Sequence, residues 1–160
     1  MGSDEGFRTV RGYLLLKGED EELSPSMEDY LEMIYRICLE ESCARVNHLA
    51  EMLNVQAPSV SRVLRKLTEK EYVKFHPYGT IQLTDKGKEL GEYLLQRHRT
   101  VEEFLRILGV KDNLLIDTEL IEHHVSADTL VRLEIINAFF QEQPGIMEKF
   151  ECYRQQRLPR

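Results

Sequence analysis

The sequence predicts a mainly α-helical protein, in which a winged helix-turn-helix DNA-binding domain precedes an all-helical domain. Two short amphipathic helical patterns are separated by the tight turn Asn54-Val55-Gln56. A β-hairpin pattern follows them directly, and the remainder of the chain carries apolar residues at three- or four-residue spacing. A hairpin directly after a helix-turn-helix is a winged helix, and the later spacing indicates further helices.

The DNA-binding domain is expected at residues 24–84, after an N-terminal extension at 1–23. Ser24 and Pro25 start its first helix, because Ser is a favoured cap and Pro is tolerated in the first turn. The expected helices and strands, in order, cover residues 24–41, 46–53, 58–70, 72–75 and 80–83. On the third helix Val60, Leu64 and Leu67 share the inward face.

The helical dimerisation and metal-binding domain is expected at residues 85–150. Thr84 caps a long helix that Gly109 ends. Two more helices are expected at 112–125 and 127–141, the second capped by Ser126. The Pro144-Gly145 break then precedes a short terminal helix and a tail at 151–160.

Composition places this 160-residue chain among ordinary cytoplasmic proteins. No run approaches the roughly 18 apolar residues that span a bilayer, so no membrane association is expected. The three cysteines show no Cys-x-x-Cys pairing, which argues against a thiolate zinc site or a disulfide framework. The net charge of -7 is unevenly distributed. Acidic residues crowd 19–41, whereas 56–75 holds five basic residues against two acidic ones, which leaves a local patch for phosphates.

The third helix presents short polar and cationic side chains on its outer face, as a recognition helix must. A solvated helix face is the simpler interpretation, but the turn before the helix and the hairpin after it favour DNA contact. The wing residues Lys74, His76 and Tyr78 would add contacts to the DNA backbone or minor groove. The predicted DNA-binding residues are Pro58, Ser59, Ser61, Arg62, Arg65 and Lys66.

Candidate metal ligands occur in three segments. On a helix, Glu119, Glu122 and His123 are at i, i+3 and i+4 and share one face. The same three side chains could equally face solvent, on the side of the helix opposite Leu120 and Ile121. His98 lies on the apolar stripe of the long helix, where an imidazole needs a partner, since an unpaired buried polar group costs about 1–3 kcal/mol.

Asp29 and Glu32 repeat the i, i+3 spacing on the first helix. Each has a simpler interpretation. Ser26 and Asp29 match a capping box, and Glu32 continues a polar stripe through Arg36.

These motifs together resemble the diphtheria-toxin-repressor family of metalloregulators, and most of all its manganese transport regulator branch. The resemblance covers about residues 24–142, with the segments 25–35, the helix-turn-helix, 96–98 and 119–126 in the family's order. It implies the ligands Asp29, Glu32, His98, Glu119, Glu122 and His123. The iron-sensing branch typically has Met and Cys where this chain has Asp29 and Glu119, so the two carboxylates favour the manganese branch.

The resemblance implies a metal-dependent repressor of metal-uptake genes, without catalytic residues or an organic substrate. Its expected cofactor is Mn²⁺, two ions per subunit, with Fe²⁺, Co²⁺, Zn²⁺ or Cd²⁺ able to replace it in vitro; oxygen and imidazole donors suit this set. Its expected partners are a palindromic double-stranded operator and a second copy of the chain. An iron-responsive repressor or a metal-independent winged-helix regulator remains open. A di-iron enzyme is disfavoured, since no histidine has a glutamate three residues before it.

Overall fold

The computed structural model describes residues 23–157, so almost all of the predicted N-terminal extension lies outside the described residues. The described chain is mainly helical with one small sheet, which confirms the predicted fold class. It divides into two compact units, and the division falls between Gln96 and Arg97, inside the long helix α5 (Asp85–Leu108). Each unit is considered by itself.

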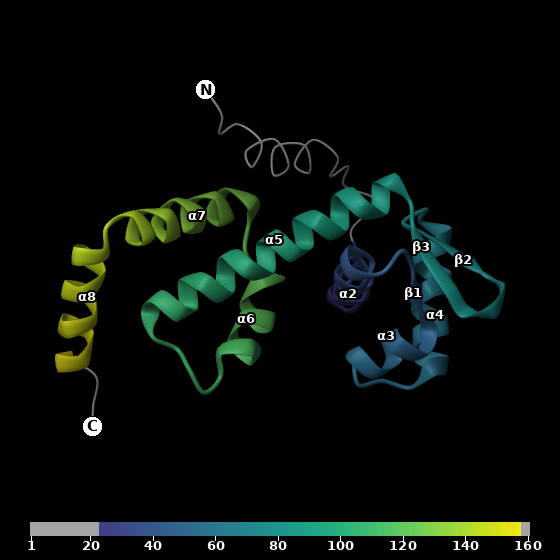
Figure 1. Ribbon diagram of the computed structural model, residues 1–160, viewed down its shortest axis with the longest axis horizontal. Coiled ribbons are helices and arrows are strands. Elements are labelled where there is room, and N and C mark those ends of the chain that lie inside the picture. The colour runs from purple at the N-terminus through teal and green to yellow at the C-terminus, as the bar shows by residue number, and fades with distance from the viewer. Residues whose placement is uncertain (1–22, 158–160) are drawn as a thin grey trace. The chain divides into compact units, whose positions relative to one another are not determined.

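Three helices build the core of the first unit (Figure 1). They are α2 (Pro25–Glu40), α3 (Val46–Met52) and α4 (Ala57–Glu69), each within one or two residues of its predicted bounds. Asn54 makes the turn between α3 and α4 with a positive φ of 52°, which Asn tolerates better than most residues. The core side chains that these helices bury completely include Leu31, Ile34, Leu49, Leu64 and Leu67.

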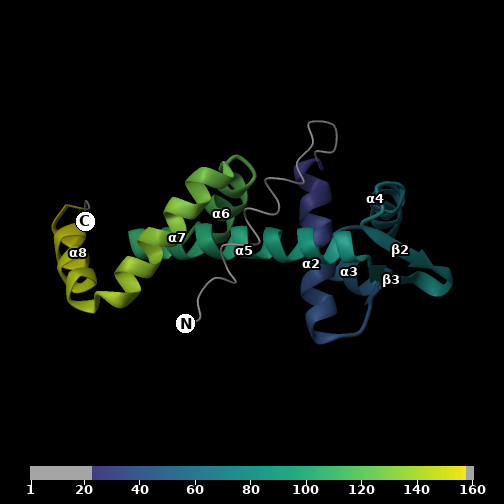
Figure 2. The same cartoon turned by 90° about the horizontal axis from the view of Figure 1, so that it is seen from above.

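The hairpin of the first unit consists of β2 (Val73–His76) and β3 (Thr80–Leu83) and is the predicted wing (Figure 2). The 3₁₀ turn η1 (Pro77–Gly79) connects the two strands, with Tyr78 at a φ of 69°. A third strand, β1 (Ala44–Arg45), pairs with β3 and was not predicted, giving the order β1-β3-β2. Two residues are too few to show the alternation that identifies a strand in a sequence.

Helix α5 begins and ends as the sequence predicts. The backbone N–H of Gly87 donates to the Thr84 hydroxyl at 3.0 Å, which is the expected capping bond. Gly109 adopts a φ of +82° directly after the helix, a conformation that favours glycine.

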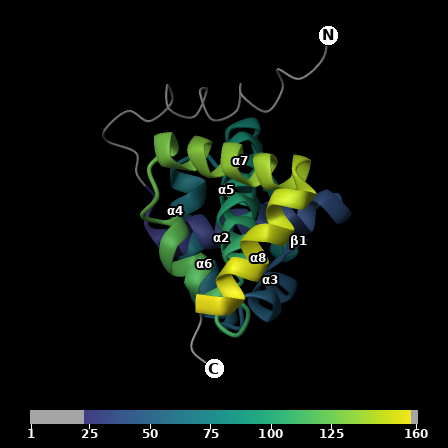
Figure 3. The same cartoon turned by 90° about the vertical axis from the view of Figure 1, so that its left-hand side faces the viewer.

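The second unit continues with α6 (Leu114–Glu122), α7 (Ala127–Glu142) and α8 (Pro144–Arg157). Helix α6 is shorter than predicted and has His123 as its C-cap. Ser126 caps α7, as expected, by accepting the Thr129 N–H at 3.2 Å. The chain changes direction between α7 and α8, at the predicted break (Figure 3), and α8 continues through residues that the sequence placed in the tail. No helix within residues 23–157 has the length and apolar character needed to cross a membrane.

Candidate metal centre and nucleic-acid interface

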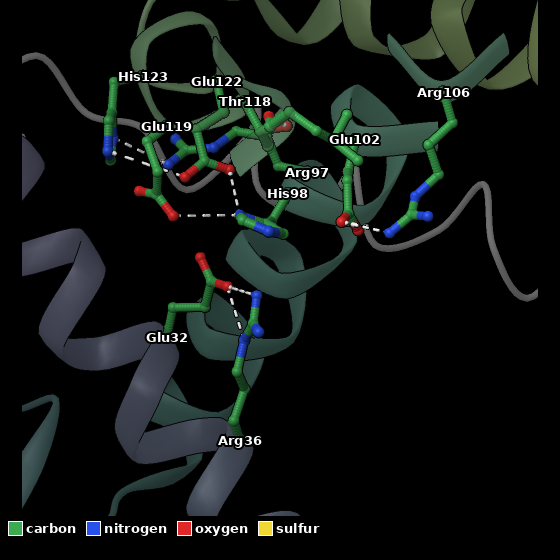
Figure 4. Close-up of polar contacts among 11 residues, drawn as sticks. Glu32, Arg36, Arg97, His98, Glu102, Arg106, Thr118, Glu119, Glu122 and His123 are labelled. Atoms are coloured by element: carbon green, nitrogen blue, oxygen red, sulfur yellow. Dashed lines mark hydrogen bonds and ion pairs between the residues drawn. The ribbon is translucent and has the colours of Figure 1, made fainter. Parts of the chain in front are cut away.

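Four of the six predicted metal ligands come together in the second unit. His98 lies on α5, while Glu119 and Glu122 lie on the last turn of α6 and His123 follows as its cap. The Nδ1 atom of His98 is 3.2 Å from Oε2 of Glu122 and 3.7 Å from Oε1 of Glu119 (Figure 4). Glu119, Glu122 and His123 each offer a donor atom within 4.8 Å of the donor atoms of the others. Two carboxylates and two imidazoles therefore form one cluster.

Glu122 is the most buried member of this cluster, with 1% of its surface exposed. Neither of its oxygens accepts a hydrogen bond from any residue that the structure describes. An ionised carboxylate without hydrogen-bond donors is costly inside a protein unless a positive charge compensates it. His98 at 3.2 Å supplies part of that compensation when protonated. The carboxylate and imidazole donors, together with this buried carboxylate, fit a divalent cation such as Mn²⁺.

The solvent-facing interpretation would place the carboxylates of α6 in water and its leucines in the core. The structure shows the opposite arrangement for Glu122 and for two leucines. Glu122 is buried, whereas Leu115 and Leu120 are 61% and 65% exposed. The solvent-facing interpretation is therefore wrong for Glu122. A helix that buries Glu122 and exposes Leu115 and Leu120 presents an apolar surface suited to another protein chain.

Arg97 fixes the tautomer of His123. Its Nη2 atom lies 3.1 Å from His123 Nδ1. Because a guanidinium has donors and no acceptors, the ring accepts this bond at Nδ1 and its proton, when the ring is neutral, resides on Nε2. A cation that binds at Nδ1 would therefore have to displace Arg97 from that nitrogen.

The other two predicted ligands, Asp29 and Glu32, belong to α2 in the first unit. Ser24 is the N-cap of α2 and Pro25 its first residue, as predicted, although the Ser24 side chain makes no capping hydrogen bond. Ser26 lies inside the helix and Asp29 a turn beyond the cap, which rules out the Ser26–Asp29 capping box. Asp29 and Glu32 share a helix face at i, i+3.

Glu32 already interacts with a cation of its own helix. Arg36, one turn further along α2, donates to Oε1 of Glu32 from Nε at 2.9 Å and from Nη2 at 2.5 Å (Figure 4). Sequence reasoning treated Arg36 as part of a solvated polar stripe, although its i, i+4 spacing from Glu32 was a usable signal. Arg97 was also missed, since nothing in the sequence pairs it with His123.

The outer face of α4 carries the six predicted DNA-binding residues, and all are exposed: Pro58, Ser59, Ser61, Arg62, Arg65 and Lys66. The predicted inward residues Val60, Leu64 and Leu67 are fully buried, which confirms the orientation of the helix. The Ser61 hydroxyl donates to the Ala57 carbonyl at 3.2 Å. At the wing, Tyr78 is fully exposed, and His76 pairs with Gln82 across the hairpin at 3.1 Å.

Two family models match the chain in succession. The model for the iron dependent repressor N-terminal DNA binding domain matches residues 22–81. The model for the iron dependent repressor metal binding and dimerisation domain matches residues 84–151. Together they account for the winged helix of the first unit and for the helices that carry His98, Glu119, Glu122 and His123.

Curated proteins named HTH-type transcriptional regulator MntR are similar to most of the chain. The protein from Geobacillus thermodenitrificans (strain NG80-2) is 42% identical over 126 residues, covering 78% of this chain and 89% of that protein. The one from Oceanobacillus iheyensis is 43% identical over 127 residues, covering 78% and 86%.

Solved structures with the same fold include the metal-dependent transcriptional regulator MtsR, with a TM-score of 0.65 and 33% identity. A manganese-dependent transcriptional repressor in complex with manganese gives a TM-score of 0.61 and 32% identity. The matches cover 73% and 71% of this chain but 55% and 53% of those proteins, so the chain spans about half their length.

Proposed function

The chain belongs to the iron dependent repressor family of transcriptional regulators, and from this membership we propose that it is a manganese-dependent repressor of metal-uptake genes in the cytoplasm. It is a regulator, not an enzyme, and it contains a metal-binding domain and a DNA-binding domain. The observation that carries the proposal is the buried Glu122 carboxylate, which accepts no hydrogen bond from residues 23–157 and lies 3.2 Å from His98.

We assign the metal ligands to Asp29, Glu32, His98, Glu119, Glu122 and His123. Mn²⁺ held by these side chains would supply positive charge that offsets the negative charges of the four carboxylates. We infer two ions per subunit, because the four negative charges of the carboxylates are twice the charge of one divalent ion, so two ions would neutralise them. Relatives described with manganese, Zn²⁺ and Cd²⁺ agree with a site of this donor chemistry.

The proposed ligands come from both units, and this explains how the metal would control DNA binding. Asp29 and Glu32 lie on α2, which packs against α3 and α4 of the DNA-binding unit. Joint ligation with the four residues of the second unit would restrict the orientation of α4. Only some orientations allow the two α4 helices of a dimer to enter major grooves about 34 Å apart, so binding would shift the population towards them.

The DNA contacts in this proposal come from α4. Arg62, Arg65 and Lys66 would meet phosphates or base edges, while Pro58, Ser59 and Ser61 at the start of the helix leave room for close approach. A palindromic operator is expected because two identical subunits would bind it.

The dimer would bury the apolar surface of the second unit. Leu115, Ile116 and Leu120 of α6 are each more than half exposed in the single chain. The matching family model describes this region as a dimerisation domain. Burial in a homodimer explains why the helix exposes its apolar residues.

Calorimetric titration of the metal-free protein with Mn²⁺ and with Fe²⁺ tests the proposal. We expect saturable Mn²⁺ binding that Glu122→Ala abolishes. Absence of binding in the parent protein would refute the metal site, and a clear preference for Fe²⁺ would identify an iron-responsive repressor instead.

A further inference from the structure

The cationic side chain of Arg36 donates hydrogen bonds to Glu32, a carboxylate that we assign as a metal ligand. Both nitrogen donors of Arg36 act on the same oxygen, Oε1, at 2.9 and 2.5 Å. The Glu32 side chain is 9% exposed, whereas that of Arg36 is 38% exposed. The carboxylate of the pair is therefore buried, whereas the Arg36 side chain is partly exposed.

We propose that Arg36 is a built-in competitor of the metal, which holds Glu32 in the metal-free protein and lowers the affinity of the site. This inference rests on the proposed function, since it concerns the regulation of the same site. Metal ligation by Oε1 requires that both hydrogen bonds from Arg36 break. The partly exposed Arg36 side chain can then turn towards water without moving the helix that carries it, because rotation about its own bonds is sufficient.

The competition has two physical components. The first is the loss of a charge-assisted interaction between neighbouring turns of α2. The second is repulsion between the guanidinium and a divalent ion bound to the same carboxylate. Both components oppose metal binding, so removing the charge of Arg36 should strengthen it. The metal concentration at which the protein responds would thus depend on Arg36.

A purely positioning role for Arg36 predicts the opposite sign. If the two hydrogen bonds served to orient Glu32 for ligation, their removal would release the carboxylate and weaken metal binding. The direction of the change therefore separates competition from positioning.

The chain offers a matched control on α5. Arg106 donates to Glu102 at 2.8 Å with the same i, i+4 spacing, and neither residue is assigned to the metal (Figure 4). Arg36→Met and Arg106→Met remove the same charge from the same kind of pair and keep a long, helix-favouring side chain.

The experiment is calorimetric titration of the full-length metal-free protein and its variants with MnCl₂. We expect Arg36→Met to bind Mn²⁺ about two- to tenfold more tightly, the range set by the net contribution of a part-exposed ion pair or an ordinary hydrogen bond. Arg106→Met should match the parent protein. In a Glu32→Gln background, Arg36→Met should lose its effect, because the competition acts through that carboxylate.

Several outcomes would overturn the inference. Unchanged or weaker Mn²⁺ binding by Arg36→Met would do so. Equally tighter binding by Arg106→Met would do so too, because it would mean that the change in net charge alone raises the affinity. Should Arg36→Met fail to fold in a circular-dichroism melt, Arg36→Lys decides the matter, since it keeps the charge without the two-pronged contact and should still bind more tightly than the parent. If the parent binds no Mn²⁺, the proposed function itself fails.

Discussion

Replacing the buried carboxylate of Glu122 by an amide should stabilise the metal-free protein and remove its response to manganese. Glu122 is 1% exposed, and neither oxygen accepts a hydrogen bond from a described residue. Leaving such a group unsatisfied costs about 1–3 kcal/mol, and a charge costs more than a neutral amide. Glu122→Gln keeps the shape and removes the charge. The amide is still buried without partners among the described residues, so only the extra cost of the charge is relieved, and we expect the metal-free form to gain on the order of 1 kcal/mol of unfolding free energy.

When manganese is added, the parent protein should become more stable than Glu122→Gln. At about 100 times its dissociation constant, a ligand stabilises the folded state by about 2.7 kcal/mol. The parent should gain this stabilisation, whereas Glu122→Gln should gain none. For a chain of this size each kcal/mol corresponds to roughly 2–4 °C, so thermal melts with and without MnCl₂ resolve both effects.

Protein concentration must be equal in all melts, because the stability of a dimer depends on it. Glu102→Gln is the matched control, since Glu102 forms an exposed ion pair with Arg106 and is no proposed ligand. It should change stability by less than about 1 kcal/mol and retain the manganese shift. A Glu122→Gln variant that melts lower than the parent without metal, and still shifts with MnCl₂, would refute the reasoning.

Three further predictions concern the metal preference, the DNA surface and the dimer. Asp29→Met should shift the metal ranking from Mn²⁺ towards Fe²⁺ or Co²⁺, because a soft thioether replaces a hard oxygen; an unaltered ranking in metal titrations would remove Asp29 from the site. Arg65→Ala and Lys66→Ala should each weaken DNA binding and reduce the log–log salt slope by about 0.9, while metal affinity is unchanged; an unchanged slope would mean that α4 does not contact phosphates. Leu120→Glu should give a monomer in light scattering, whereas the comparably exposed Leu39→Glu on α2 should remain dimeric; a dimeric Leu120→Glu would place the interface elsewhere.

The helices and the wing could be predicted from the sequence because local signals define them. Thr84 and Gly109 mark the ends of α5, and Val60, Leu64 and Leu67 identify the inward face of α4. Strand β1 gave no such signal, since its two residues pair with β3 only through tertiary structure.

The candidate site was harder to predict, because spacing along a helix does not reveal which face is buried. The pattern of α6 allowed Glu122 to face solvent opposite Leu120, but in the structure Glu122 is buried and Leu120 is exposed. In the dimer that we propose, the apolar side of α6 would contact the partner subunit, which explains why the pattern misleads. Likewise, the contact between Arg97 and His123 joins residues 26 positions apart and depends on how α5 and α6 pack.

Metal-dependent DNA binding tests the central claim most directly. Duplexes that the protein selects from random-sequence DNA in the presence of MnCl₂ can be labelled and titrated by fluorescence anisotropy, with MnCl₂ or with EDTA. We expect tight binding to a palindromic sequence with manganese, weak and sequence-independent binding with EDTA, and no manganese effect in His123→Ala. Equal affinity for the selected duplex in manganese and in EDTA would contradict the account.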